Sequence, residues 1–97
     1  MSVYINAQIT IHDREAYNKY EAGFMEIFNA HGGTLLAVEE APTVLEGEWA
    51  CTRTIIAEFP NKDSALAWYN SDAYQSLMKH RLAGSTGSIA ILSGLPA

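Results

Sequence analysis

The segment from Glu58 to Tyr74 constrains the fold more than any other part of this sequence. It opens at the end of a strand pattern, which Pro60 stops because a prolyl nitrogen cannot donate a hydrogen bond to a neighbouring strand. Asn61 and Ser71 are residue types that cap helix N-termini, so we expect one short helix after each of them. The residues before this segment then have to supply a strand, a helix and a strand, and those after it a closing strand.

Residues 3–11 predict the first strand, because apolar and polar side chains alternate with a period of two. One face carries Val3, Ile5, Ala7, Ile9 and Ile11, and the other carries Tyr4, Asn6, Gln8 and Thr10. Asp13 is placed to cap the amphipathic helix that follows, and Gly32-Gly33 ends it because glycine tolerates the left-handed backbone of helix C-termini. The apolar stripe of this helix consists of Tyr17, Tyr20, Phe24, Ile27, Phe28 and His31.

The remaining residues predict three more strands. Residues 34–38 are apolar after the first and indicate a buried strand, and residues 40–51 form a long connection or a protruding hairpin arm. Residues 52–59 alternate again, and one of their faces carries Arg53, Ile55, Ala57 and Phe59. After the helices, residues 83–87 are expected to form a loop and residues 88–93 the closing strand.

This order predicts an α+β fold of the ferredoxin-like βαββαβ kind, an antiparallel sheet with its helices on one face. A chain of 97 residues is expected to form one such domain, residues 1–97. The other sheet face is left bare, and its side chains on the first strand are neither strongly charged nor wholly apolar. A broad mixed face favours pairing with a second sheet, so we expect a two-fold homodimer whose sheets meet face to face.

Composition excludes several classes of function. Six Lys and Arg against eleven Asp and Glu give a net charge of −5, and the basic residues are scattered, which argues against nucleic acid as a partner. The sequence contains no apolar run long enough for a membrane span, and its N-terminus lacks the pattern of a signal peptide. The single Cys51 fits a reducing compartment, so we expect a cytoplasmic protein.

Arg81 is the most informative candidate for a ligand site. Its spacing from Tyr74, Leu77 and Met78 turns it toward the apolar side of its helix, where a guanidinium needs a partner. One alternative is internal: a salt bridge to Glu58 or Glu46, or contact with helix C-terminal carbonyls. The other is a clamp for a carboxylate-bearing ligand.

Three further residues complete the predicted ligand-binding set of Arg81, His80, Glu46 and Tyr69. Histidine is the side chain best able to move protons in catalysis, which makes His80 and His31 candidates, although His31, at a helix end, is expected to interact with the last carbonyls of that helix. Glu46 lies in a turn and is either a general base or a carboxylate bonded to nearby groups. The histidines lack metal-ligand spacing, so we propose no metal and no cofactor.

Motifs spread along the chain carry a resemblance to a known family. They are Tyr4-Ile5-Asn6-Ala7, Asp13, Tyr17, His31-Gly32-Gly33, Val44-Leu45-Glu46-Gly47, Glu58-Phe59-Pro60, Ala67-Trp68-Tyr69-Asn70-Ser71, Tyr74 and Arg81. Together they resemble the DUF1330 family, and the resemblance implies a dimeric α+β barrel without implying an activity. Members often continue the second strand with Arg-Gly-Gly, whereas this chain has Val38, Glu39 and Glu40, so the arginine is absent here and negative charge is added next to its position.

These observations favour a homodimer that binds a small carboxylate-bearing or aromatic molecule in a cleft between helices and sheet. The wider fold group includes cofactor-independent monooxygenases and muconolactone-isomerase-like enzymes, so oxygenation or proton transfer is the enzymatic interpretation. The alternative is a structural or regulatory dimer without catalysis. A third hypothesis is haem binding through His31 or His80, because haem-handling proteins also belong to this fold group.

Overall fold

The computed structural model describes residues 1–50 and 52–96, so Cys51 lies outside the described residues. The elements are β1 (Val3–Ile11), α1 (Arg14–Ala30), β2 (Thr34–Glu39), β3 (Arg53–Phe59), α2 (Lys62–Asn70), α3 (Asp72–Gly84) and β4 (Ser85–Ser93). Their order confirms the predicted α+β ferredoxin-like fold, with the second helical part divided at Ser71 as expected. In the part of the chain that the structure describes, no helix is long and apolar enough to cross a membrane.

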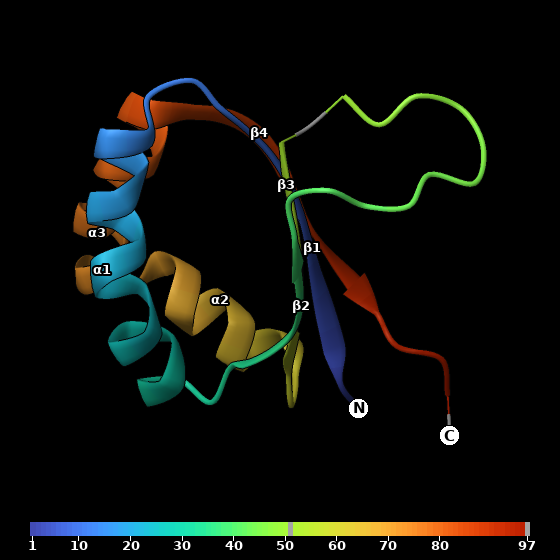
Figure 1. The fold of residues 1–97 in the computed structure, drawn as a ribbon. Coiled ribbons are helices and arrows are strands. Elements are labelled where there is room, and N and C mark those ends of the chain that lie inside the picture. The colour runs from blue at the N-terminus through green and yellow to red at the C-terminus, as the bar shows by residue number, and fades with distance from the viewer. Residues whose placement is uncertain (51, 97) are drawn as a thin grey trace.

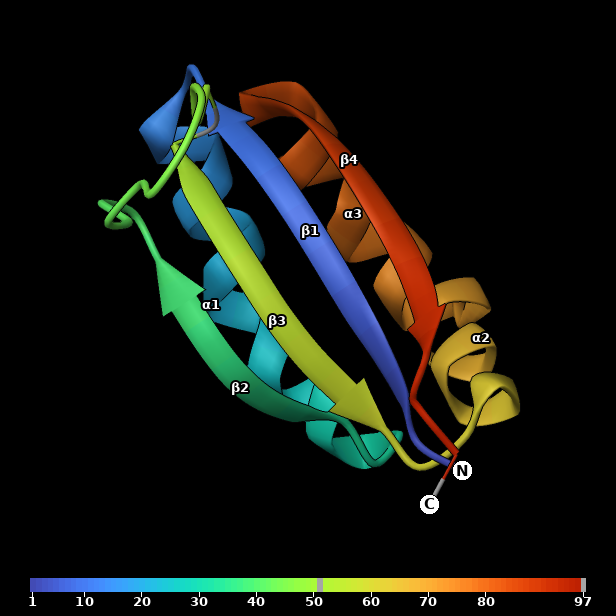
Figure 2. The same cartoon turned by 90° about the vertical axis from the view of Figure 1, so that its right-hand side faces the viewer.

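The four strands form one antiparallel sheet in the order β2-β3-β1-β4. Figure 1 shows the sheet nearly edge-on with all three helices on one side, and Figure 2 shows the opposite face turned to the viewer with the helices behind it. The apolar residues of β1 face the helices, and Val3, Ile5, Ala7 and Ile9 are each 6% exposed or less. The alternation in the sequence therefore predicts correctly which face of β1 is buried.

The connection between β2 and β3 projects away from the helices, on the side of the open sheet face (Figures 1 and 2). Leu45 in this connection is 90% exposed. Trp49 lies nearer the sheet, where its indole nitrogen donates to the Thr54 hydroxyl on β3 at 2.9 Å. The predicted protruding connection is confirmed, and it places exposed apolar side chains beside the open face.

The three predicted helix caps are confirmed. The Asp13 carboxylate accepts from the Ala16 amide, the Asn61 side chain from the Ser64 amide, and the Ser71 hydroxyl from the Tyr74 amide. At the other end of α1, Gly32 has a φ of +84°, the left-handed conformation that glycine adopts with little strain. Residue types that satisfy free backbone groups thus fix where the helices begin and end.

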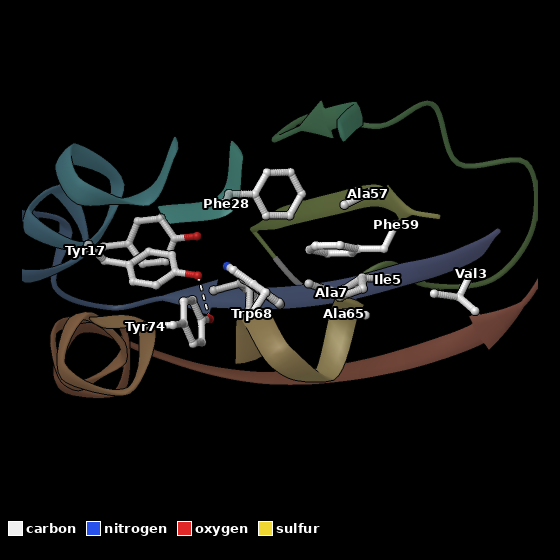
Figure 3. Close-up of a cluster of buried hydrophobic side chains, with 12 residues drawn as sticks. Val3, Ile5, Ala7, Tyr17, Phe28, Ala57, Phe59, Ala65, Trp68 and Tyr74 are labelled. Atoms are coloured by element: carbon white, nitrogen blue, oxygen red, sulfur yellow. Dashed lines mark hydrogen bonds between the residues drawn. The ribbon is translucent and has the colours of Figure 1, made fainter. Parts of the chain in front are cut away.

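The core lies between the helices and the sheet and is rich in aromatic residues. Phe28 and Phe59 are 0% exposed, and their rings meet edge-to-face with centroids 5.1 Å apart. Trp68 from α2 contacts both rings at 5.5 Å. Figure 3 shows these side chains filling the space above β1. Aromatic residues from three separate elements therefore join both halves of the chain.

Two expectations are wrong. The 34–38 segment is not a buried strand, because β2 is an edge strand in which Leu35 alone is half-buried and a register shift occurs between Leu35 and Ala37. The 83–87 loop does not exist, because α3 runs to Gly84 and β4 begins at Ser85. A Cβ on Gly84 would lie 2.6 Å from the Asp13 carbonyl oxygen, so glycine here allows the end of α3 to pack against the start of α1.

Candidate functional site

A small pocket opens between α1 and the β2–β3 half of the sheet, and we treat it as the candidate site. Its volume is about 100 Å³. It is lined by Tyr17, Tyr20, Glu21, Phe24, Met25, Leu35, Val38, Arg53 and Ile55. Helical spacing brings the aromatic residues of α1 to the sheet side, and the alternation of β3 places Arg53 and Ile55 opposite them. The result is an apolar slot with one guanidinium in its wall.

Arg53 is the charged group of this wall. Its side chain is 14% exposed, and its guanidinium carbon lies 5.7 Å from the centroid of the Tyr17 ring. Nη1 donates to the Glu40 carboxylate at 2.6 Å, and Nη2 lies 3.6 Å from a Glu21 carboxylate oxygen. The Nε atom is buried and has no hydrogen-bond partner among the described residues. Two carboxylates thus hold the outer edge of the guanidinium, while one of its donors stays unsatisfied.

Glu40 joins this group to α1. It is the first residue after β2, and it also accepts from the Arg14 guanidinium, at 2.8 and 3.4 Å. The hydrogen bond from Arg14, which has the larger effect, and the one from Arg53 hold the pKa of the Glu40 carboxyl below its ordinary value. The negative charge that the sequence places after the second strand therefore pairs with two arginines beside the pocket.

A second polar group lies behind the pocket wall. The hydroxyl groups of Tyr20 and Tyr74 are 2.8 Å apart, and both residues are buried. The guanidinium carbon of Arg81 lies 5.9 Å from the Tyr20 ring centroid. Burial, with the neighbouring Tyr74 hydroxyl, raises the pKa of Tyr20 far above its ordinary value, so this phenol keeps its proton at neutral pH. The pocket wall can therefore supply a hydrogen-bond donor, and it lies next to a positive charge.

Trp68 packs against this polar group. The centroid of its ring lies 4.3 Å from that of the Tyr74 ring. The dashed line in Figure 3 marks the hydroxyl contact of Tyr74. The indole nitrogen is buried and, within residues 1–50 and 52–96, has no hydrogen-bond partner. Several donors thus converge in the interior between α1, α2 and α3.

Arg81 is buried, 6% exposed, as its helical spacing predicts. The expected salt bridge is not found, because no ion pair of Arg81 exists in the described part of the chain. Glu58 lies on the open sheet face, opposite Tyr4 in the register of β1 and β3, and Glu46 lies on the exposed connection. Neither carboxylate therefore lies on the helix side of the sheet, where Arg81 is buried. The aromatic ring of Tyr20 takes the place of the expected carboxylate.

The structure does not bring the four predicted ligand residues into one site. His80 is exposed on α3, and Glu46 is exposed on the connection near Trp49. Tyr69, which is half-buried, lines a separate groove of about 450 Å³ between α2 and β4 with Lys62 and Leu66. Arg81 alone contacts a residue of the pocket described above, and the set as a whole stays a prediction.

His31 follows its expected role, because its Nδ1 atom lies 2.9 Å from the Ile27 carbonyl oxygen at the end of α1. No group of three or more metal-binding side chains occurs among residues 1–50 and 52–96.

Sequence reasoning missed Arg53 and Glu40 as site residues. A signal for Arg53 existed, since it shares a strand face with Ile55, Ala57 and Phe59, and a charge on a core-facing position needs an explanation. Glu40 carried no such signal. Glu40 and Arg53 lie at opposite ends of the connection between β2 and β3, and no local sequence pattern predicts that this connection brings them into contact.

Comparison with known proteins gives a family and a shared fold. The sequence model of a family described as a domain of unknown function (DUF1330) matches residues 2–95. A search of curated proteins gives no match.

Solved structures from three organisms share the fold. A protein of unknown function from Rhodopseudomonas palustris has a TM-score of 0.83 and 18% identity, covering 99% of this chain and 84% of that chain. SnoaB, a cofactor-independent oxygenase from Streptomyces nogalater, has a TM-score of 0.65 and 14% identity, covering 99% and 95%. A dimeric ferredoxin-like protein of unknown function from Jannaschia sp. has a TM-score of 0.68 and 13% identity, covering 97% and 100%. At these identities the likeness establishes the fold alone.

Proposed function

The chain belongs to the DUF1330 family, and on that premise we propose that it forms a homodimer that binds a small aromatic molecule in the pocket between α1 and the β2–β3 pair. The observation that carries the proposal is the lining, in which Tyr17, Tyr20 and Phe24 share the pocket wall with a largely buried guanidinium, that of Arg53. Mostly apolar pockets with a few placed polar groups are the usual form of small-molecule sites.

The size of the pocket favours a single ring. Apolar cavities of about 150 Å³ are known to hold benzene, and this pocket of about 100 Å³ opens to solvent, so part of a ligand can extend outward. An aromatic ring gains edge-to-face or stacked contacts with the tyrosine and phenylalanine rings of α1. A carboxylate-bearing aromatic ligand is compatible with the same ring contacts.

The enzymatic form of the proposal is proton transfer or cofactor-free oxygenation of an acidic aromatic substrate. When the Tyr74 hydroxyl donates to that of Tyr20, the proton of Tyr20, which lines the pocket, is free to be donated to a ligand oxygen. With Arg81 nearby, this donor would stabilise negative charge on that oxygen. The shared fold with SnoaB supports this class by analogy.

Filling the pocket tests the proposal. Val38 lines it from the edge strand and is 41% exposed, so Val38→Trp is expected to fill the slot without disturbing the core. Wild type should bind phenol and benzamide in ligand-observed NMR titrations, and Val38→Trp should weaken both by about tenfold, the equivalent of about 1.4 kcal/mol. Leu82→Trp, at a 57% exposed position on α3, should bind as wild type does. If Val38→Trp binds phenol and benzamide as tightly as wild type does, the ligands do not bind in this pocket.

The homodimer is proposed from the open face of the sheet. Ile56 lies at its centre, paired across the strands with Asn6 and Ala37, and half-exposed Leu92 lies toward the end of β4. The connection between β2 and β3 projects on the same side (Figure 1), and it contains Leu45, which is 90% exposed. The face is mixed, with Asn6, Gln8 and Thr54 beside Ile56, and apolar side chains left partly exposed on a broad sheet face are typical of an interaction surface. The dimeric Jannaschia protein of the same fold supports a second copy as the occupant.

A charge at the centre of that face should dissociate the dimer. We expect wild type to sediment as a dimer and Ile56→Glu to raise the dimer dissociation constant by about a hundredfold, because two like charges would be buried against each other. Leu82→Glu on α3 supplies the matched control and should stay dimeric. A wild-type monomer, or an Ile56→Glu dimer of unchanged affinity, would contradict the face-to-face arrangement.

A further inference from the structure

We propose that Glu40 determines the charge of the ligand: it occupies the edge of Arg53 that a ligand carboxylate would use, so the pocket selects uncharged aromatic molecules over aromatic carboxylates. The inference rests on the proposed aromatic site and names the class of ligand that the site takes, a neutral ring bearing a hydroxyl or amide group.

The geometry at Arg53 carries the first step. Glu40 accepts from Nη1 at 2.6 Å, and the Glu21 carboxylate lies 3.6 Å from Nη2. A carboxylate binds a guanidinium best through two parallel N–H groups. Both terminal nitrogens of Arg53 already face protein carboxylates, so an incoming carboxylate would have to displace one of them.

Charge gives the second step. The ion-pair group at Arg53 contains two arginines, Arg14 and Arg53, and two glutamates, Glu21 and Glu40, so its formal charges sum to zero. Arg81, whose guanidinium carbon lies 5.9 Å from the Tyr20 ring centroid, is not among the residues that line the pocket. A ligand carboxylate would bring a third negative charge next to two others, in a wall where Arg53 is largely shielded from water. An uncharged ring meets no such repulsion, and its entry leaves the ion pairs intact.

The unsatisfied donor of Arg53 gives the third step. Its Nε–H is buried and without a partner among the described residues, whereas its terminal nitrogens are engaged. A neutral oxygen acceptor, such as a phenol or an amide carbonyl, satisfies an N–H donor without a compensating charge. The Nε atom is closed to solvent in this structure, so a ligand oxygen reaches it only after a shift of the Arg53 side chain, whereas Glu40 neutralises the charge of Arg53 in either position.

The test compares ligands of one shape and different charge. Benzamide and benzoate are nearly isosteric, and phenol is a smaller neutral probe. Glu40→Gln keeps the shape and the amide oxygen as an acceptor for Arg53 but removes the charge. Glu26→Gln, on the exposed side of α1, removes the same charge where the described residues form no ion pair. NMR titrations of all three probes are run on the intact protein.

The expected result is that wild type binds benzamide and phenol about tenfold more tightly than benzoate. Glu40→Gln should strengthen benzoate binding by about tenfold and change phenol binding less than about twofold, whereas Glu26→Gln should leave all three as in wild type. Glu40→Asp, which retains the charge, should keep the wild-type preference and guards against an effect of altered folding.

Two results separate the failures. If benzamide and phenol bind wild type but Glu40→Gln shifts benzoate no more than Glu26→Gln does, the role of Glu40 is wrong and the aromatic site stands. If no probe binds wild type or Glu40→Gln, the aromatic site itself is wrong, and the selectivity falls with it.

Discussion

Replacing Phe28 with alanine is expected to lower the free energy of unfolding by about 3–5 kcal/mol, the usual cost of removing a buried phenylalanine. The side chain is 0% exposed and lies at the centre of the aromatic core. It stacks on Phe24 with centroids 4.9 Å apart and meets Phe59 and Trp68 edge-to-face. A Cβ on Gly33 would lie 2.4 Å from the Phe28 ring, so the chain after α1 already closes tightly over it.

Chemical denaturation by urea, followed by circular dichroism, measures this loss. Because the rings around Phe28 come from α1, β3 and α2, they cannot collapse into the cavity without moving three elements. Leu82→Ala, at an exposed position, should change the free energy of unfolding by less than about 0.5 kcal/mol. A loss below about 1 kcal/mol for Phe28→Ala would mean that the site relaxes and that the core is not closely packed there.

Local features of this fold could be predicted from the sequence because local chemistry determines them. The alternation over residues 3–11 gave the buried face of β1, since a strand has one period and one core-facing side. The side chains of Asp13, Asn61 and Ser71 marked three helix starts, since each satisfies backbone N–H groups that no other group of the helix can.

Features that depend on strand order could not be read in this way. The apolar residues 34–38 indicate a strand, but burial depends on its neighbours, and β2 has a partner on one side alone. At Gly84 the local sequence is typical of a loop, whereas the tight approach to Asp13 is a contact between residues distant in the chain. Both errors come from tertiary contacts that no short window contains.

Only the burial of Arg81 beside the candidate site followed from the sequence, and the pocket residues themselves did not. Helical spacing turned Arg81 inward, and it is buried, but its neighbour is the Tyr20 ring and not Glu58 or Glu46. The contact of Glu40 with Arg53 depends on how the connection after β2 returns to β3. Residue spacing predicts which side of a helix or strand a side chain occupies, but the tertiary structure determines which residues it contacts there.

Arg81 distinguishes a ligand-binding protein from a structural module. Its guanidinium is buried without an ion pair in the described residues, its Nε atom lacks a partner, and a cation–π contact compensates little for the lost hydration. Arg81→Met keeps an unbranched apolar stem and removes the charge. We expect the free energy of unfolding of this variant to lie between the wild-type value and about 1 kcal/mol above it, because a buried charge is replaced by an apolar group.

The same variant is expected to weaken phenol binding by about tenfold, since the positive charge beside Tyr20 would no longer favour an electron-rich oxygen in the pocket. Arg81→Ala should lose the same affinity and also about 2–3 kcal/mol of stability, because it leaves a cavity that methionine would fill. Denaturation and NMR titration of both variants separate the two roles. If Arg81→Met loses more than about 2 kcal/mol of stability and binds phenol as wild type does, the guanidinium is structural, and a non-catalytic dimer becomes the better account of this chain.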